Sequence, residues 1–146
     1  VASLHDRLAY VADCVSNKPR RRVFVLEWID PPFGAGHWVP DIVIAAGGQP
    51  VVARPGEKSI TTSWAEINAA SPEVVIVAPC GYGLEAAAAQ AQSIQHLLPS
   101  TCEVWAIDAD AVMVRPGARL VDGVEAIAAM LHNISDVPTH LVRQVR

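Results

Sequence analysis

Aromatic and polar side chains crowd the stretch that follows a strand-like run, Val23–Trp28. Open α/β sheets bind ligands in the crevice at the carboxyl ends of their strands, so this loop is a natural recognition surface. Aromatic rings would offer flat faces to a large planar or macrocyclic ligand, and the carboxylates of Glu27 and Asp30 would accept its hydrogen bonds. The alternative is that the two tryptophans are ordinary core residues. The stretch supplies six candidate ligand-binding residues: Trp28, Asp30, Pro32, Phe33, His37 and Trp38.

Two residues of these loops have reactive side chains. His37 could ligate a metal, because neutral imidazole is the commonest protein metal donor, or it could simply occupy the first turn of a helix. Cys80 follows a strand, where a thiolate could act as a nucleophile, but the sequence identifies no partner histidine, and cysteine is commonly a small buried hydrophobe. Cys14, Cys80 and Cys102 are too widely spaced for a metal motif. We predict no catalytic residue, no metal site and no required cofactor.

Gly81-Tyr82-Gly83 supports a different function. With Leu84, Glu85 and Ala86 it fits G-x-G-x-x-A between a strand and a helix, the pattern that lets backbone approach a pyrophosphate. Such folds have an acidic residue at the end of the next strand that binds the ribose; the candidate here, Asp108, is somewhat farther along the chain than usual. The alternative function is therefore a nucleotide-binding α/β enzyme that uses this loop.

The periodicity of apolar residues predicts the elements that must position these side chains. Strands are expected at Val23–Trp28, Pro50–Ala53, Val74–Ala78, Glu103–Ile107 and Ala111–Val114. Helices are expected to end at Ser16 and to span Val39–Ala46, Trp64–Ala70, Leu84–Leu97 and Arg119–His132. Strands that alternate with helices predict a Rossmann-like three-layer α/β sandwich with a mostly parallel central sheet.

Three loops should then meet at one edge of the sheet. They follow the strands and span Glu27–His37, Pro79–Gly83 and Asp108–Asp110. Carboxyl ends of parallel strands share an edge, so these loops bring Tyr82 and Asp108 to the candidate site.

Four sequence blocks, in order, carry a resemblance to a known family. They are Arg22–Gly48, Ser63–Val77, Ala78–Gly83 and Arg115–Gly123. Together they resemble the C-terminal lobe of an ABC transporter substrate-binding protein of the cobalamin-binding and iron-siderophore type, the helical-backbone class. The resemblance implies that residues 1–20 are the end of an inter-lobe helix and its linker, 21–135 a ligand-binding lobe and 136–146 a C-terminal extension. It finds no counterpart of the N-terminal lobe.

The resemblance also implies a function. It implies noncovalent binding of a corrinoid or siderophore, with cobalamin as one possible ligand, and an ABC permease as partner. Arg115 would meet the ligand or the opposite lobe, or else lie in a solvated turn. The family docks on its permease through an acid where this chain has Ala65, beside Glu66. Because a single lobe covers half of a ligand, a homodimer is expected to supply the missing wall.

Composition and net charge bear on which classes of function remain possible. The chain has 146 residues and a net charge of −4, which argues against a dedicated nucleic-acid binder. The basic cluster at 18–22 is interpreted as a solvated connection between a helix and a strand rather than a phosphate patch. A transporter role implies a periplasmic or extracytoplasmic location, while the lack of a signal peptide at Val1 leaves the cytoplasm open.

Overall fold

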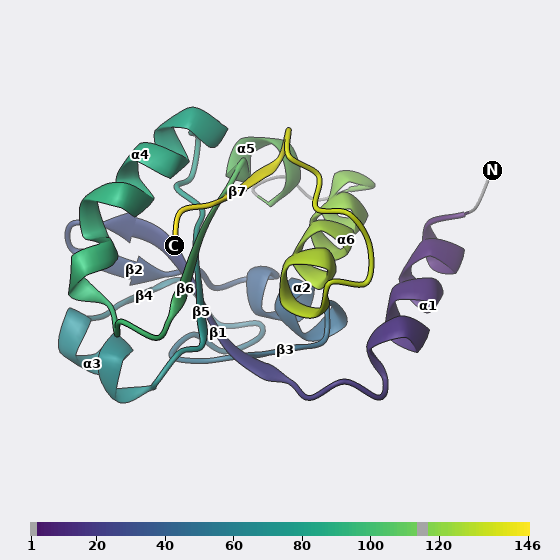
Figure 1. The fold of residues 1–146 in the computed structure, drawn as a ribbon, viewed down its shortest axis with the longest axis horizontal. Coiled ribbons are helices and arrows are strands. Elements are labelled where there is room, and N and C mark those ends of the chain that lie inside the picture. Colours follow the sequence, from purple (N-terminus) through teal and green to yellow (C-terminus); the bar gives the residue numbers. More distant parts are fainter. Residues whose placement is uncertain (1–2, 114–116) are drawn as a thin grey trace.

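The computed structural model describes residues 3–113 and 117–146, whose strands form one sheet with helices on both faces (Figure 1). The strands of these residues are β1 Arg21–Ile29, β2 Pro32–Gly34, β3 Gly48–Pro50, β4 Ile60–Thr61, β5 Val74–Val77, β6 Glu103–Ile107 and β7 Val142–Gln144. Their order is β4-β2-β1-β5-β6-β7, and β3 also pairs with β1. The pairs β3–β1, β1–β5 and β5–β6 are parallel, whereas β2, β4 and β7 join antiparallel.

The central strands are apolar on both faces because helices cover both. Alternate residues of β1 therefore enter different clusters: Val23 and Val25 pack on one side of the sheet, and Phe24 and Leu26 on the other. The helices are α1 Leu4–Val15, α2 Val39–Ala45, α3 Trp64–Ala69, α4 Leu84–Ile94, α5 Ala109–Val112 and α6 Arg119–His132, with a 3₁₀ turn, η1, at Gln95–Leu97. The first cluster includes residues of α1, α2, α5 and α6, and the second those of α3 and α4. The predicted three-layer α/β fold is confirmed.

Several predicted boundaries were wrong. Ala111 and Val112 belong to the helix α5 rather than to a strand, because the Asp108 side chain accepts a hydrogen bond from the Ala111 N–H at 3.0 Å and so caps a helix start. Position 114 lies outside the described residues. The strand expected at Pro50–Ala53 ends at Pro50, and Val52 has a φ of +71° that no strand adopts. The helix from Leu84 ends at Ile94 and continues only as the turn η1.

The basic cluster at 18–22 serves the fold. The Arg20 guanidinium donates to the carbonyls of Ile44 and Gly48, near the end of α2. Arg21 and Arg22 donate in the same way to the carbonyls of Leu131 and Ser71. These arginines therefore satisfy carbonyls close to helix ends, which supports the structural interpretation over a phosphate patch.

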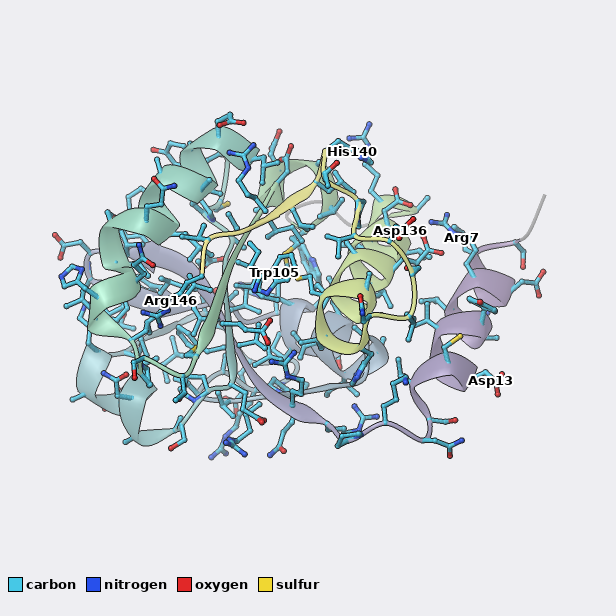
Figure 2. All side chains as sticks on the ribbon, in the orientation of Figure 1. Arg7, Asp13, Trp105, Asp136, His140 and Arg146 are labelled. Atoms are coloured by element: carbon cyan, nitrogen blue, oxygen red, sulfur yellow. The ribbon has the colours of Figure 1, made fainter. Side chains whose placement is uncertain are left out.

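The C-terminal residues add a strand to the sheet. β7 pairs with β6, and the Arg146 guanidinium donates to the carbonyls of Gln95, Pro99 and Cys102, beneath α4 (Figure 2). Among residues 3–113 and 117–146, no helix has the length and apolar character needed to cross a membrane.

Candidate ligand-binding site

The loop after β1 folds back as a short antiparallel hairpin before α2 begins. In this hairpin Trp28 pairs with Phe33, and Ile29 pairs with Pro32. Pro32 is buried, and its carbonyl accepts a hydrogen bond from the Thr62 N–H at 2.9 Å, so it has a structural role in the hairpin. Phe33 is half-buried, whereas Asp30 is exposed. The sequence predicted a single strand-to-helix loop here and missed β2, a strand of only three residues.

A cavity of about 230 Å³ opens where β1 and β5 end. Val25, Val39 and Ala78 form apolar parts of its wall, and polar groups reach it from Glu27, His37 and Cys80. Trp38 and Met113 complete the wall. The cavity thus joins the loops after β1 and β5 with the end of α5. Two of the three expected loops contribute to it, whereas residues 108–110 do not line it.

Trp38 fastens the cavity wall. Its indole Nε1–H donates to the Met113 carbonyl at 2.7 Å, which ties the start of α2 to the end of α5. The side chain also packs against the core cluster on this face of the sheet. Trp38 is therefore a structural anchor that also lines the cavity, and its role in ligand binding stays a prediction.

His37 is held in a left-handed backbone conformation, with φ of +57°. Its N–H donates to the Glu57 carbonyl at 2.6 Å, and its own carbonyl accepts the Gly56 N–H at 3.1 Å. Gly36 permits this close approach, because a Cβ at residue 36 would lie 2.4 Å from the Glu57 oxygen. The segment around Glu57 therefore fixes the backbone that presents the imidazole.

Trp28 and Tyr82 form an aromatic pair close to the cavity. Their ring centroids are 6.0 Å apart with an interplanar angle of 41°, and the residues are 38% and 41% exposed. Trp28 lies at the end of β1, next to the cavity residue Glu27, and Tyr82 lies in the loop after β5, two residues from the cavity residue Cys80. An exposed pair of this size is a ready surface for a flat apolar ligand.

Among the described residues, the remaining predicted ones do not line this cavity. The Asp108 carboxylate caps α5, and Arg115 lies outside the described residues. Cys80 and Met113 do line it, although the sequence analysis gave neither a binding role. The position of Cys80 after a strand was a usable signal. Met113 could not be found, because the sequence predicted a strand where a short helix turns the chain back.

The cysteines differ sharply in environment. Cys80 is exposed, Cys14 is half-buried and Cys102 is buried, and all three thiols are free. Burial raises the pKa of the Cys102 thiol to about 11, so Cys102 stays neutral near pH 7. Within the described residues, no group of three or more histidine, cysteine or acidic side chains is arranged to hold a metal ion.

The glycine loop of the alternative function takes a turn conformation. Gly81 has a φ of +83°, and Gly83 is the N-cap of α4. Glu85, in the first turn of α4, pairs with Arg143 at 2.6 Å, and this guanidinium lowers the pKa of the Glu85 carboxyl. The Glu85 carboxyl therefore stays ionised in the first turn of α4, where it is paired with the Arg143 guanidinium.

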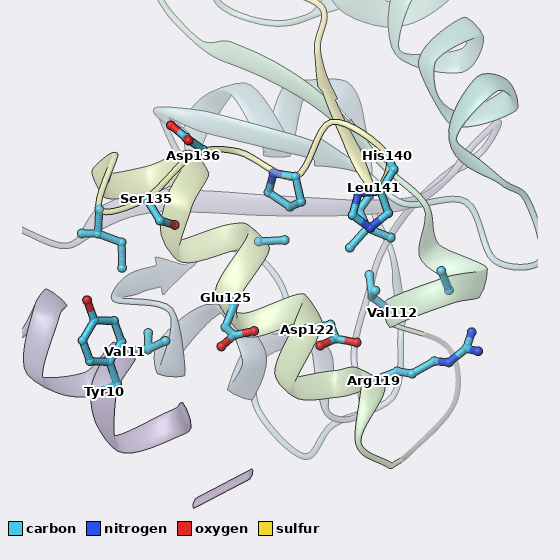
Figure 3. Close-up of a pocket in the computed structure, with 14 residues that line it drawn as sticks. Tyr10, Val11, Val112, Arg119, Asp122, Glu125, Ser135, Asp136, His140 and Leu141 are labelled. Atoms are coloured by element: carbon cyan, nitrogen blue, oxygen red, sulfur yellow. The ribbon is translucent and has the colours of Figure 1, made fainter. Parts of the chain in front are cut away.

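A larger cavity of about 640 Å³ lies among α1, α5, α6 and residues 134–141 (Figure 3). None of the predicted site residues that the structure describes lines it. Arg7 of α1 spans to α6, where its guanidinium pairs with Asp122 at 2.5 Å and also with Glu125. One guanidinium thus pairs with two acidic groups of this cavity, which leaves one negative charge unbalanced among the three side chains.

Comparisons with solved structures identify the architecture. The fold is similar to a periplasmic heme binding protein from Pseudomonas aeruginosa, with a TM-score of 0.73 and 21% identity over 96% of this chain and 55% of that chain. It is similar to the periplasmic vitamin B12 binding protein of Vibrio cholerae, with a TM-score of 0.67 and 22% identity over 86% of this chain and 49% of that one. An ABC transporter substrate-binding protein from Listeria monocytogenes matches with a TM-score of 0.75 and 15% identity over 89% of this chain and 54% of that chain.

These likenesses show the fold of a single lobe of a periplasmic binding protein. The chain spans about half the length of the structures that it matches. No protein-family model and no curated protein matches the sequence.

Proposed function

We propose that this chain reversibly binds a metal-bearing small molecule of the corrinoid, heme or siderophore kind, as one lobe of an ABC transporter substrate-binding protein. One observation carries the proposal: the cavity lined by His37, Trp38 and Cys80 lies beside the exposed pair Trp28–Tyr82 at the carboxyl edge of the sheet. In α/β sheets this edge is where ligands bind. The solved structures of similar fold include proteins named for vitamin B12, heme and an Fe³⁺-hydroxamate.

The size of the cavity supports a half-site. Its volume of about 230 Å³ is smaller than the roughly 300–1,000 Å³ of ordinary ligand pockets. A macrocycle would therefore place only an edge or one substituent in the cavity, while its ring lay across Trp28 and Tyr82. A second wall would have to come from another lobe or a second copy of the chain. The homodimer expected from the sequence gains no support from the comparisons and stays a prediction.

We place this activity in an extracytoplasmic transport system, on the strength of the fold and the names of the similar structures. Its partner would be an ABC permease. The acid that the related proteins are expected to use for docking is replaced by Ala65, in α3. Glu66 is exposed, and its carboxylate accepts a hydrogen bond from the Thr62 hydroxyl at 2.6 Å. It is the neighbouring carboxylate that could dock on the permease in place of the missing acid.

Quenching of tryptophan fluorescence by cyanocobalamin, hemin and ferrioxamine tests the proposal. We expect saturable quenching by at least one of these probes, weakened by Tyr82→Leu. Tyr10→Leu is the matched control, because Tyr10 is also an exposed tyrosine but lines the larger cavity near α1.

The two variants also locate the site. Loss of affinity in Tyr10→Leu alone would move binding to the larger cavity and refute the rim site. Binding of ATP or NAD, but of none of the three probes, would favour the glycine-loop enzyme instead.

A further inference from the structure

Glu27 is an extra residue near the end of β1. In the antiparallel pairing of β1 with β2, the register shifts between Leu26 and Trp28, so that β1 has one residue more than β2 at this point. A bulge of this kind re-aims the side chains beside it, and bulges are common next to functional sites. Here Glu27 lines the cavity of about 230 Å³, and Trp28 forms the exposed aromatic pair with Tyr82.

The Glu27 carboxylate has no partner in the part of the chain that the structure describes. Glu27 is half-buried, and it takes part in no hydrogen bond or ion pair within residues 3–113 and 117–146. Among these residues, no lysine or arginine lines the cavity. Other half-buried glutamates are paired, because Glu103 contacts Arg21 and Glu125 contacts Arg7. Glu27 therefore leaves an unbalanced negative charge on the wall of the cavity.

A ligand that covers the cavity must compensate this carboxylate. Displacing water from a carboxylate costs free energy unless the ligand supplies a hydrogen-bond donor or a positive charge in exchange. A second carboxylate at the same place would add repulsion between like charges. Trp28, the next residue along the chain, adds with Tyr82 a surface for a flat apolar body. The two features together define a ligand with an apolar body and donor groups at its periphery.

We infer that Glu27 selects, among metal chelates, those whose periphery donates hydrogen bonds or carries positive charge, and rejects those with peripheral carboxylates; this inference rests on the proposed function. The corrin ring carries carboxamide side chains, whose N–H groups would donate to Glu27. Heme instead carries two propionate groups, which would meet the Glu27 charge in a cavity that no lysine or arginine of the described residues lines. A corrinoid is therefore a better ligand for this site than heme.

Corrinoids that differ by one amide test the inference. Cyanocobalamin has three isomeric monocarboxylates, in each of which one propionamide is hydrolysed to a carboxylic acid. Quenching of tryptophan fluorescence measures the dissociation constant of each. We expect at least one isomer to bind about fivefold more weakly than cyanocobalamin, the size typical of a partly exposed pair of charges. Added salt should narrow this difference, because it screens the repulsion.

Glu27→Gln removes the charge and keeps the shape of the side chain. This variant should bind all three monocarboxylates as tightly as cyanocobalamin, and it should bind hemin about fivefold more tightly than the unchanged protein does. Asp13→Asn is the matched control for net charge, because Asp13 is an exposed acid of α1 that does not line the cavity (Figure 2). The control should leave every dissociation constant unchanged.

Ferrioxamine B gives a second series on a different chelate. Its terminal ammonium becomes a neutral amide in the N-acetyl derivative and a carboxylate in the N-succinyl derivative. The affinity of the unchanged protein should fall in that order, and Glu27→Gln should remove the differences. If only one of the two series binds, the comparison within that series decides.

Several results would overturn the inference and leave the proposed function standing. They are equal affinities within the series that binds, differences that survive Glu27→Gln, and tighter binding of hemin than of cyanocobalamin and ferrioxamine B by the unchanged protein. The comparisons within the unchanged protein decide even if Glu27→Gln fails to fold. Binding of none of these probes would overturn the inference together with the proposed function.

Discussion

Replacing Trp38 by phenylalanine tests how the cavity wall is held together. The substitution keeps an aromatic ring against the core but removes the indole N–H that donates to the Met113 carbonyl at 2.7 Å. Trp64 offers a matched control, because it too is half-buried and packs on a core cluster, on the opposite face of the sheet. Within the described residues the Trp64 indole takes part in no hydrogen bond.

The expected difference follows from the hydrogen bond alone. Both substitutions lose similar apolar area, so this loss largely cancels in the comparison. A net hydrogen bond contributes about 0.5–1.5 kcal/mol, so Trp38→Phe should be less stable than Trp64→Phe by about 1 kcal/mol. For a chain of this size that corresponds to about 2–4 °C in Tm.

Urea unfolding followed by far-UV circular dichroism measures the difference without relying on tryptophan emission. The midpoint should fall further in Trp38→Phe than in Trp64→Phe, with equal slopes, because the exposed surface on unfolding is almost unchanged. Equal midpoints for the two variants would refute the view that the indole hydrogen bond fastens α2 to α5. A changed slope of the free energy against urea in one variant would show that its unfolding is no longer two-state or that its unfolded state differs in compactness.

Three further outcomes are expected. Gly36→Ala should abolish quenching by cyanocobalamin and lower the urea midpoint, because the added Cβ would meet the Glu57 backbone. Gly83→Ser, at an open N-cap, should preserve both properties. Loss of quenching in both variants would contradict this account. The free energy of unfolding should fall as pH rises from about 9 to 11, because burial raises the pKa of Cys102 from 9.0 to about 11, so that unfolding releases its proton in that range; Cys102→Ala should flatten this part of the profile. Arg146→Ala should cost about 1–2 kcal/mol in urea unfolding, because its guanidinium satisfies three carbonyls, whereas Arg143→Ala breaks only an exposed ion pair and should leave the midpoint unchanged; equal effects would contradict the capping role.

Much of the fold was predictable because the strong signals are local. The continuous apolar runs at Val23–Leu26 and Val74–Val77 predicted buried parallel strands, and both lie at the centre of the sheet. Ser63 precedes Trp64, with Glu66 three residues after it, a spacing that is typical of a capping box, and its hydroxyl accepts a hydrogen bond from the Glu66 N–H at 3.1 Å. In place of the reciprocal bond of such a box, the Glu66 carboxylate accepts a hydrogen bond from the Thr62 hydroxyl.

Short antiparallel elements escaped prediction. β2 and β4 contain three and two residues, too few for any alternation to be visible. They form by pairing in turn at one edge of the sheet: β2 pairs with the backbone of β1, and β4 pairs with that of β2. β7 is fixed in the same way, by pairing with β6.

The sequence by itself determined the class of fold, the edge of the sheet at which polar and aromatic residues gather, and the two loops that carry Trp38 and Tyr82. Periodicity and strand order suffice for these, because they depend on neighbouring residues. Only the tertiary structure decided which side chains share a cavity. It put Cys80 and His37 on the wall of one cavity, brought the Met113 carbonyl to the Trp38 indole N–H, and made the Asp108 carboxylate a helix cap. Such contacts depend on packing between loops that are distant in the chain, which no local pattern encodes.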